Sequence, residues 1–149
     1  MAPMFKLADS SDQALVLQLM QEFYQVEQLD FQDDIIAAAV DQLLHNPHLG
    51  HIYLLQVAGE SAGYLVVTHC FSLEFGGQFL LLDELYIRES YQGQGLGKAS
   101  LEFLESVAHA EGINVIRMEV NQHNTRAKAV YCKSGYQDGD RTLFSKWLT

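Results

Sequence analysis

Hydrophobic residues recur at two spacings along the chain, and the change of spacing separates predicted helices from predicted strands. Apolar positions at helical spacing predict an amphipathic helix over 12–26, behind the cap candidates Ser10, Ser11 and Asp12. A second helix is expected over 32–45, since Pro47 pushes the preceding residue out of helical backbone. Three strands are then predicted at 51–58, 64–75 and 79–87, with glycine-containing turns between them.

The rest of the chain alternates between helix and strand patterns. A glycine-spaced segment at 92–98 leads into a predicted helix that ends near Ala110, with Gly112 as its stop. A strand over 115–120, a helix over 124–134 and a final strand over 143–148 follow. This order predicts a mixed α+β sheet. A chain of 149 residues has the length of one domain, which we expect to span 1–149.

The composition is that of a packed globular protein, with 48% hydrophobic residues, 2 prolines and 11 glycines. The longest apolar runs, at 35–40 and 79–82, are far shorter than the ~20 residues that cross a bilayer. The N-terminus lacks the basic and apolar regions of a secretory signal. Cys70 and Cys132 could form one disulfide at most, so we expect a reduced, cytoplasmic protein with no membrane partner.

The formal net charge of −10 argues against nucleic acid as the main ligand. Residues 1–90 carry two basic and thirteen acidic side chains, whereas residues 91–149 carry seven basic and six acidic ones. An anionic ligand is therefore expected at the C-terminal half and a cationic one at the N-terminal half. The alternative is that the acidic residues only keep the protein soluble.

Three alternating glycines, Gly93, Gly95 and Gly97, stand between the strand at 79–87 and the next helix. Without Cβ atoms, successive backbone N–H groups can turn toward one point, where the helix dipole adds positive charge. Lys98 in the first helical turn is unfavourable unless an anion lies nearby. The segment thus predicts a phosphate site, the alternative being an ordinary turn with Lys98 in water. Its spacing is not that of a dinucleotide or ATP loop.

Two motifs resemble the Gcn5-related N-acetyltransferase (GNAT) family. Gln92-x-x-Gly95-x-Gly97, after a strand that ends Asp83-Glu84-Leu85-Tyr86-Ile87, is similar to the acetyl-CoA motif of that family. Asn124-x-x-Ala127-x-x-x-Tyr131-x-x-x-Gly135-Tyr136 resembles its downstream helix. The resemblance implies a mostly antiparallel sheet of six or seven strands flanked by about four helices, with a splay between the fourth and fifth strands. Gln92 departs from the commoner arginine.

The resemblance also implies which residues contact acetyl-CoA. The backbone of Leu85, Tyr86 and Ile87 would align the pantetheine arm and polarise the acetyl carbonyl. Asn124 would hydrogen-bond the same arm, and Tyr131 would lie near the sulfur. The backbone N–H groups of the loop would hold the pyrophosphate, from Gln92 and Gly93 through Gln94, Gly95, Leu96 and Gly97 to Lys98.

Acetyl transfer to an amine needs a proton acceptor, because presenting an alkylamine neutral at pH 7 costs about 4 to 5 kcal/mol. Strand alternation places Asp83 on the face of Leu85 and Ile87, unless a bulge swaps the faces, and Glu84 is the second candidate. Alternatively, the two acids bind the substrate cation or pair with basic neighbours. Tyr131 is the candidate general acid for the thiolate, the alternative being a packed aromatic ring.

The acceptor is expected to be a cationic amine, either a small molecule such as a polyamine or aminoglycoside or a lysine side chain. Tyr24, Glu27 and Glu74 are the candidate contacts, although acids of this kind are often only solvated. His45, His48 and His51 straddle Pro47 without a clear fourth ligand, so no metal site is expected.

These features favour an acetyl-CoA-dependent N-acetyltransferase that uses direct attack by the amine. One alternative is a non-catalytic acyl-CoA-binding or sensory module on the same fold. Another is an interaction domain whose glycine loop binds no CoA. Strand 143–148 could pair between two chains, so a homodimer is possible.

Overall fold

The computed structural model describes residues 2–149 and divides the chain into two compact units. The first ends at Glu119, and the second spans Val120–Thr149. The single domain expected over 1–149 stays a prediction.

The first unit contains one open, mixed sheet in the order β1-β2-β3-β4-β5. Neighbouring strands are antiparallel except for β4 and β5, which are parallel. The mixed α+β fold is confirmed, but the expected six or seven strands are wrong, because the described residues form five. The strands are β1 (Met4–Leu7), β2 (Gly50–Val57), β3 (Glu60–Ser72), β4 (Gly77–Ile87) and β5 (Ile116–Met118).

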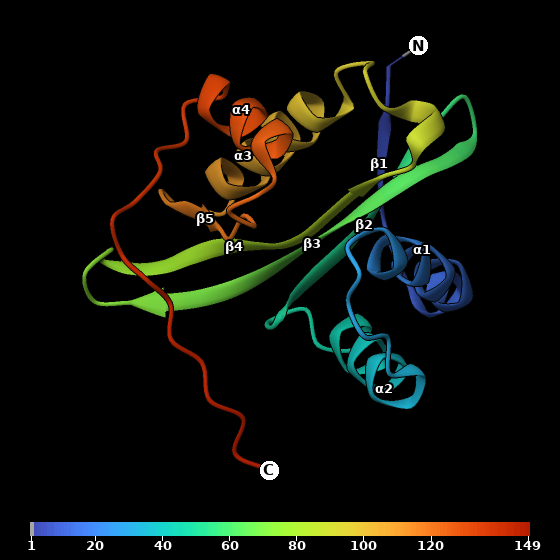
Figure 1. Cartoon of the computed structure of the whole chain (residues 1–149), viewed down its shortest axis with the longest axis horizontal. Coiled ribbons are helices and arrows are strands. Elements are labelled where there is room, and N and C mark those ends of the chain that lie inside the picture. The colour runs from blue at the N-terminus through green and yellow to red at the C-terminus, as the bar shows by residue number, and fades with distance from the viewer. Residues whose placement is uncertain (1) are drawn as a thin grey trace. The chain divides into compact units, whose positions relative to one another are not determined.

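Helices cover both faces of this sheet. The helices α1 (Gln13–Val26) and α2 (Asp33–Leu44) lie on one face, and α3 (Leu96–Ala110) lies on the other (Figure 1). Short 3-10 turns at Ser10–Asp12 and Glu89–Tyr91 precede α1 and α3. The helical spacing of the sequence is confirmed by burial, since Val16 and Leu19 of α1 are fully buried in a core that includes Ile52 and Tyr64.

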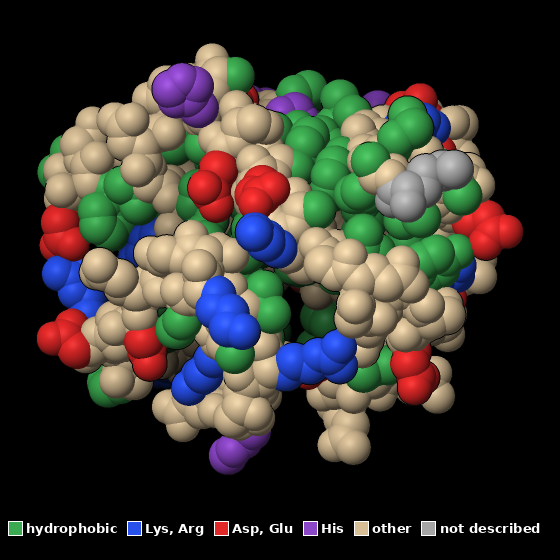
Figure 2. All heavy atoms as spheres, turned by 90° about the horizontal axis from the view of Figure 1, so that it is seen from above, with side chains coloured by type: hydrophobic (Ala, Val, Ile, Leu, Met, Phe, Trp, Pro, Cys, Tyr) green, Lys and Arg blue, Asp and Glu red, His purple; other side chains and the backbone are tan. Residues whose placement is uncertain are grey.

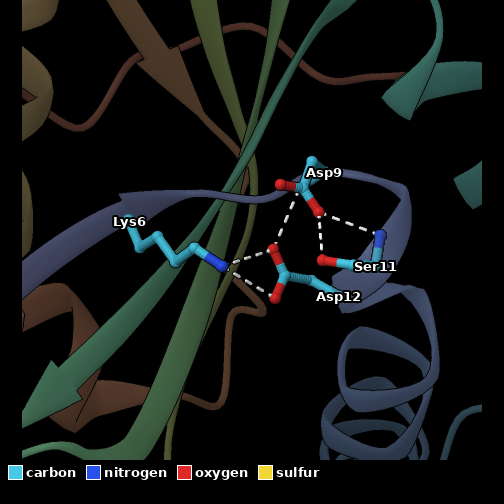
Figure 3. A network of polar contacts seen from close by, with 4 residues as sticks. All are labelled: Lys6, Asp9, Ser11 and Asp12. Carbon is cyan, nitrogen blue, oxygen red and sulfur yellow. Dashed lines mark hydrogen bonds and ion pairs between the residues drawn. The ribbon is translucent and has the colours of Figure 1, made fainter.

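A polar network fixes the entry into α1 (Figure 3). The Asp9 carboxylate accepts hydrogen bonds from the backbone and hydroxyl of Ser11, and the Asp12 carboxylate accepts one from the Asp9 N–H at 3.0 Å. This reciprocal capping box satisfies N–H groups at the start of the 3-10 turn Ser10–Asp12, which leads directly into α1. Lys6 of β1 pairs with Asp12 at 2.9 Å. The network thus links β1, which the hydrophobic pattern did not indicate, to the start of α1.

The second unit contains α4 (Thr125–Lys133), capped by Asn124, whose side-chain oxygen accepts from the Ala127 N–H at 3.0 Å. The strand expected over 143–148 is wrong: these residues have no regular secondary structure. A strand needs a partner for its backbone groups, and 143–148 pair with none in this structure. Their hydrophobic side chains are exposed, with Phe144 and Trp147 both at 91%.

Within residues 2–149, no helix combines the length and the apolar character needed to cross a bilayer. The face drawn in Figure 2 exposes Asp and Glu side chains as well as Lys and Arg. It is therefore not a uniformly basic surface of the kind that binds a nucleic-acid backbone.

Candidate active site

The glycine segment forms the connection between β4 and α3. Gly93 and Gly95 have left-handed backbone, with φ of 79° and 77°, and Gly95 is the N-cap of α3. A Cβ atom at either position would meet no other atom within 4 Å, so the space above the loop is open. Among the described residues, Ala99 is the first of α3 whose N–H has a backbone acceptor, the Gly95 carbonyl at 3.0 Å. The loop therefore offers backbone donors to an anion.

Gln92 and Lys98, at the two ends of this loop, have different surroundings. Gln92 donates from Nε2 to the Ile87 carbonyl at 3.0 Å and so ties the loop to the end of β4. Lys98 is exposed, with its Nζ 3.9 Å from a Glu102 carboxylate oxygen one turn later. Lys98 thus remains accessible to an incoming phosphate.

The strands β4 and β5 pair only over a short stretch. Their ladder joins Leu80–Leu82 to Ile116–Met118, whereas β4 continues to Ile87. Just beyond the ladder, a cavity of about 80 Å³ is lined by Leu81, Leu82, Asp83 and Glu119. We call this place the fork. From Asp83 to Ile87, β4 continues without pairing to β5 along this edge. The two strands therefore separate past the fork, as the expected splay requires.

A bulge in β4 occurs at the fork. Leu82 pairs with Val67 and Glu84 pairs with the adjacent Val66, so Asp83 is an extra residue in β4. Neighbouring positions of a strand face opposite sides of a sheet, so the bulge places Leu82 and Glu84 on opposite faces. Alternation therefore does not determine the face of Asp83, and the argument that grouped it with Leu85 and Ile87 does not hold.

The bulge turns Glu84 toward the helix α1 side of the sheet. There Tyr24 of α1 donates to Glu84 Oε2 at 2.5 Å, and Tyr64 of β3 donates to Oε1 at 2.7 Å. Burial raises the pKa of Glu84, the two hydroxyl donors partly offset this, and Asp83 raises it further. Burial and the Glu84 carboxylate raise the pKa of both Tyr24 and Tyr64, so both remain donors. Sequence reasoning missed Tyr64.

Asp83 also has a perturbed acidity. Its side chain is exposed at the fork, but the surrounding protein desolvates it and raises its pKa, and the nearby Glu119 carboxylate adds to the rise. Two adjacent carboxyl groups with raised pKa values are a common feature of proton-transfer sites.

Basic neighbours do not neutralise this acidic pair. Arg88 binds both carboxylate oxygens of Glu22, at 3.0 and 2.8 Å, and also donates to the Ser61 carbonyl. Tyr86 donates to the same Glu22 at 3.1 Å. The alternative in which Asp83 and Glu84 serve as partners of Arg88 or Lys98 is therefore wrong.

The expected acceptor contacts are separated in the structure. Tyr24 contacts Glu84, and Glu27 is the half-buried C-cap residue of α1. Glu74 is exposed in the turn before β4, and the strand from Gly77 to Glu84 spans about 24 Å at 3.4 Å per residue. The structure thus brings Tyr24, but not Glu74, to the acidic pair.

Asn124 and Tyr131 belong to the second unit. The cap bond of Asn124 uses its side-chain oxygen, which leaves the amide N–H₂ for another partner. Tyr131 is half-buried, with its ring 6.4 Å from that of Tyr136. Their roles toward acetyl-CoA stay predictions.

Curated relatives of this chain are N-acetyltransferases by name. The bovine thialysine N-epsilon-acetyltransferase is 29% identical over 143 residues, which cover 91% of this chain and 84% of that protein. An uncharacterized N-acetyltransferase of Lactobacillus delbrueckii subsp. lactis is 36% identical over 85 residues, which cover 56% of this chain and only 49% of that protein.

Solved structures share the fold. An integron cassette protein from the mobile metagenome of Cole Harbour Salt Marsh matches with a TM-score of 0.86 and 30% identity, over 97% of this chain and 90% of that one. A predicted acetyltransferase with acetyl-CoA from Clostridium acetobutylicum matches with a TM-score of 0.81 and 18% identity, over 97% and 96% of the two chains.

The model of the acetyltransferase (GNAT) family matches residues 14–136, a range that includes both motifs and the acidic pair. The chain belongs to the acetyltransferase (GNAT) family.

Proposed function

We propose that this protein is an N-acetyltransferase that moves the acetyl group of acetyl-CoA to a primary amine by direct nucleophilic attack. One observation carries the proposal. The open glycine loop at the start of α3 follows the end of β4, and β4 carries two carboxyl groups, Asp83 and Glu84, with raised pKa values. Family membership and the solved relative with acetyl-CoA support the same cosubstrate.

The cosubstrate would bind along β4 and the loop. Backbone N–H groups from Gln92 to Lys98 would hold the pyrophosphate at the positive end of α3. The pantetheine arm would extend along Leu85–Ile87 as an additional strand, on the edge that β5 leaves past the fork. Asn124 would donate its free amide N–H₂ to this arm. None of these contacts needs a metal.

We assign the proton-accepting role to Glu84. Its hydrogen bonds to Tyr24 and Tyr64 fix the carboxylate, and each oxygen keeps a further lone pair for the amine or an intervening water. A raised pKa makes the ionised form of Glu84 a stronger base than a solvent-exposed glutamate. Asp83, exposed at the fork beside Glu119, would attract the substrate ammonium group.

The proposed transfer removes two protons from the substrate ammonium group. The first passes to solvent as the amine becomes neutral, and the second passes to Glu84 as the amine attacks the thioester carbonyl carbon. The carbon–sulfur bond then breaks, Tyr131 gives its hydroxyl proton to the departing thiolate, and the proton on Glu84 returns to Tyr131 through solvent. Because a thiol pKa is near 8.5, protonation by Tyr131 accelerates the reaction but is not indispensable.

The acceptor is proposed to be cationic, a polyamine-like or aminoglycoside-like amine or a lysine side chain. Two observations favour a positively charged substrate. The fork is lined by acidic residues, and residues 1–90 carry thirteen acidic side chains but only two basic ones. The name of the bovine relative also specifies an amino group, the Nε of thialysine.

Thiol release from acetyl-CoA tests the proposal, with a panel of cationic, neutral and anionic amines at low and high salt. We expect release that depends on a cationic amine and weakens as salt rises. A preference for neutral or anionic amines would contradict the cationic acceptor. Binding of acetyl-CoA without amine-stimulated release would instead indicate a non-catalytic acyl-CoA-binding module.

A further inference from the structure

A second cluster of titratable side chains lies away from the fork. His51 of β2, His69 of β3 and Glu111, the C-cap residue of α3, each offer a ligand atom, and these atoms lie within 4.8 Å of one another. His51 pairs with Val67, two residues before His69, so the two imidazoles share the sheet face that α3 covers. Three elements distant in sequence thus converge on one point.

The chemistry of the cluster is that of a zinc site. Two imidazoles and one carboxylate are a common set of protein ligands for Zn²⁺, with water in the fourth position. His69 Nε2 lies 3.4 Å from Glu111 Oε1. Ligand atoms ~2.1 Å from a tetrahedral Zn²⁺ are also about 3.4 Å apart, so this pair already has the spacing that the ion requires.

His69 is largely buried at the cluster. Its side chain is only 12% exposed, and its Nδ1 atom is buried with no hydrogen-bond partner among the described residues. Nε2 is the nitrogen beside Glu111, so Nε2 would bind the ion and Nδ1 would point away from it. The second ring nitrogen of a zinc-binding histidine usually donates to an oxygen atom, so a water beside Nδ1 would complete the site.

The surroundings also favour a cation. Glu111 stands at the C-terminal end of α3, where the helix dipole is negative.

The cluster is separate from the reaction site. The helix α3 has 15 residues, so its two ends are about 22 Å apart, with the glycine loop at one end and Glu111 at the other. An ion here would fasten the end of α3 to β2 and β3 without touching the acetyl group.

We propose that His51, His69 and Glu111 bind one Zn²⁺ ion that stabilises the packing of α3 on the sheet. The spacing of the three residues along the chain gives no sign of this site. The sequence analysis considered His51 only together with His45 and His48 and predicted no metal site. In the structure His45 Nδ1 lies 2.8 Å from the Asp41 carbonyl oxygen of α2.

Zinc titration of the full chain, stripped of metal by a chelator, tests the proposal by calorimetry and thermal unfolding. We expect one Zn²⁺ per chain and a melting temperature that rises with zinc. Glu111→Gln keeps the size of an exposed side chain and should weaken zinc binding about tenfold or more, as should His69→Ala. The matched control His48→Ala changes an exposed histidine outside the cluster and should bind zinc as the unchanged chain does.

Two results would overturn the proposal. One is the absence of saturable zinc binding by the unchanged chain. The other is a Glu111→Gln variant that keeps both its zinc affinity and its zinc-dependent melting temperature, which would place any bound ion elsewhere. Neither readout depends on acetyl transfer, so failure of the proposed enzyme activity leaves this test intact.

Discussion

The hydroxyl of Tyr24 donates a 2.5 Å hydrogen bond to Glu84, 60 residues away along the chain. The bond joins α1 to the bulged part of β4, where the bulge has brought Glu84 to the helix side of the sheet. Tyr64 holds the other oxygen of the same carboxylate. This arrangement fixes the orientation of the carboxyl group that we propose as the base.

Replacement of Glu84 by glutamine should lower kcat about a hundredfold, because the amide cannot take the amine proton. The variant should unfold at the same or a higher temperature near neutral pH. The folded pKa of Glu84 is raised, so the stability linked to its protonation is present below about pH 4.5 and is lost as pH rises through the folded pKa. Steady-state kinetics and thermal unfolding check the two expectations. Asp83→Asn is the comparison, and a larger kcat loss there would move the base to Asp83.

Replacement of Tyr24 by phenylalanine should raise the pKa of Glu84 further, because it removes a donor that stabilises the ionised carboxylate. The acidic limb of the kcat–pH profile should then move to higher pH. Tyr91→Phe is the matched control, since the Tyr91 hydroxyl binds the exposed Glu60 at 2.8 Å. An unmoved limb in Tyr24→Phe would show that this hydrogen bond does not tune the reaction.

Replacement of Tyr131 by phenylalanine should lower kcat about tenfold or more while the Kd for acetyl-CoA changes little. The hydroxyl is proposed to protonate the thiolate and not to hold the cosubstrate. Single-turnover kinetics and calorimetry separate the two effects. Tyr136→Phe, which removes the hydroxyl of the neighbouring ring, should keep kcat. Equal turnover of Tyr131→Phe and the unchanged protein would remove Tyr131 from the mechanism.

We propose that a second copy of the chain covers the exposed C-terminal residues. Leu143, Phe144, Trp147 and Leu148 are each at least 69% exposed, and several exposed large hydrophobic side chains in one short segment favour association. Light scattering after gel filtration should give the mass of a dimer, and Phe144→Glu with Trp147→Glu should give that of a monomer. A monomeric unchanged chain at high concentration would contradict the expectation.

Regular periodicity was enough to predict the helices and the long strands. The spacing of Leu15, Leu19, Phe23 and Val26 predicts a helix with one buried face. In α1, Leu19 is fully buried and Leu15 and Phe23 pack against the same core, whereas Val26 in the last turn is 68% exposed. By contrast, β1 is a four-residue strand with mostly exposed side chains, so the hydrophobic pattern carries no signal for it. The segment 143–148 has strand-like residues but no partner strand, and a propensity alone does not form a sheet.

The sequence predicted the position of the glycine loop before a helix, but not the surroundings of the acidic pair. Glycine spacing is a local signal of a tight connection, whereas the face of Glu84 depends on a single extra residue opposite Val66 and Val67. Tyr64 could not be assigned to the site without knowing that bulge. The cluster of His51, His69 and Glu111 depends on the register of the sheet and on the residue at which α3 ends. No short sequence motif predicts either of these.

The affinity of a Gly95→Ala variant for acetyl-CoA, measured by calorimetry, tests the central claim most directly. A methyl group at Gly95 meets no protein atom but enters the space proposed for the pyrophosphate. Gly59→Ala is the matched control, because Gly59 has a similar φ of 80° and equally open surroundings in the β2–β3 turn. We predict a Kd at least about tenfold weaker for folded Gly95→Ala and an unchanged Kd for Gly59→Ala. Unchanged acetyl-CoA binding by folded Gly95→Ala would contradict the account.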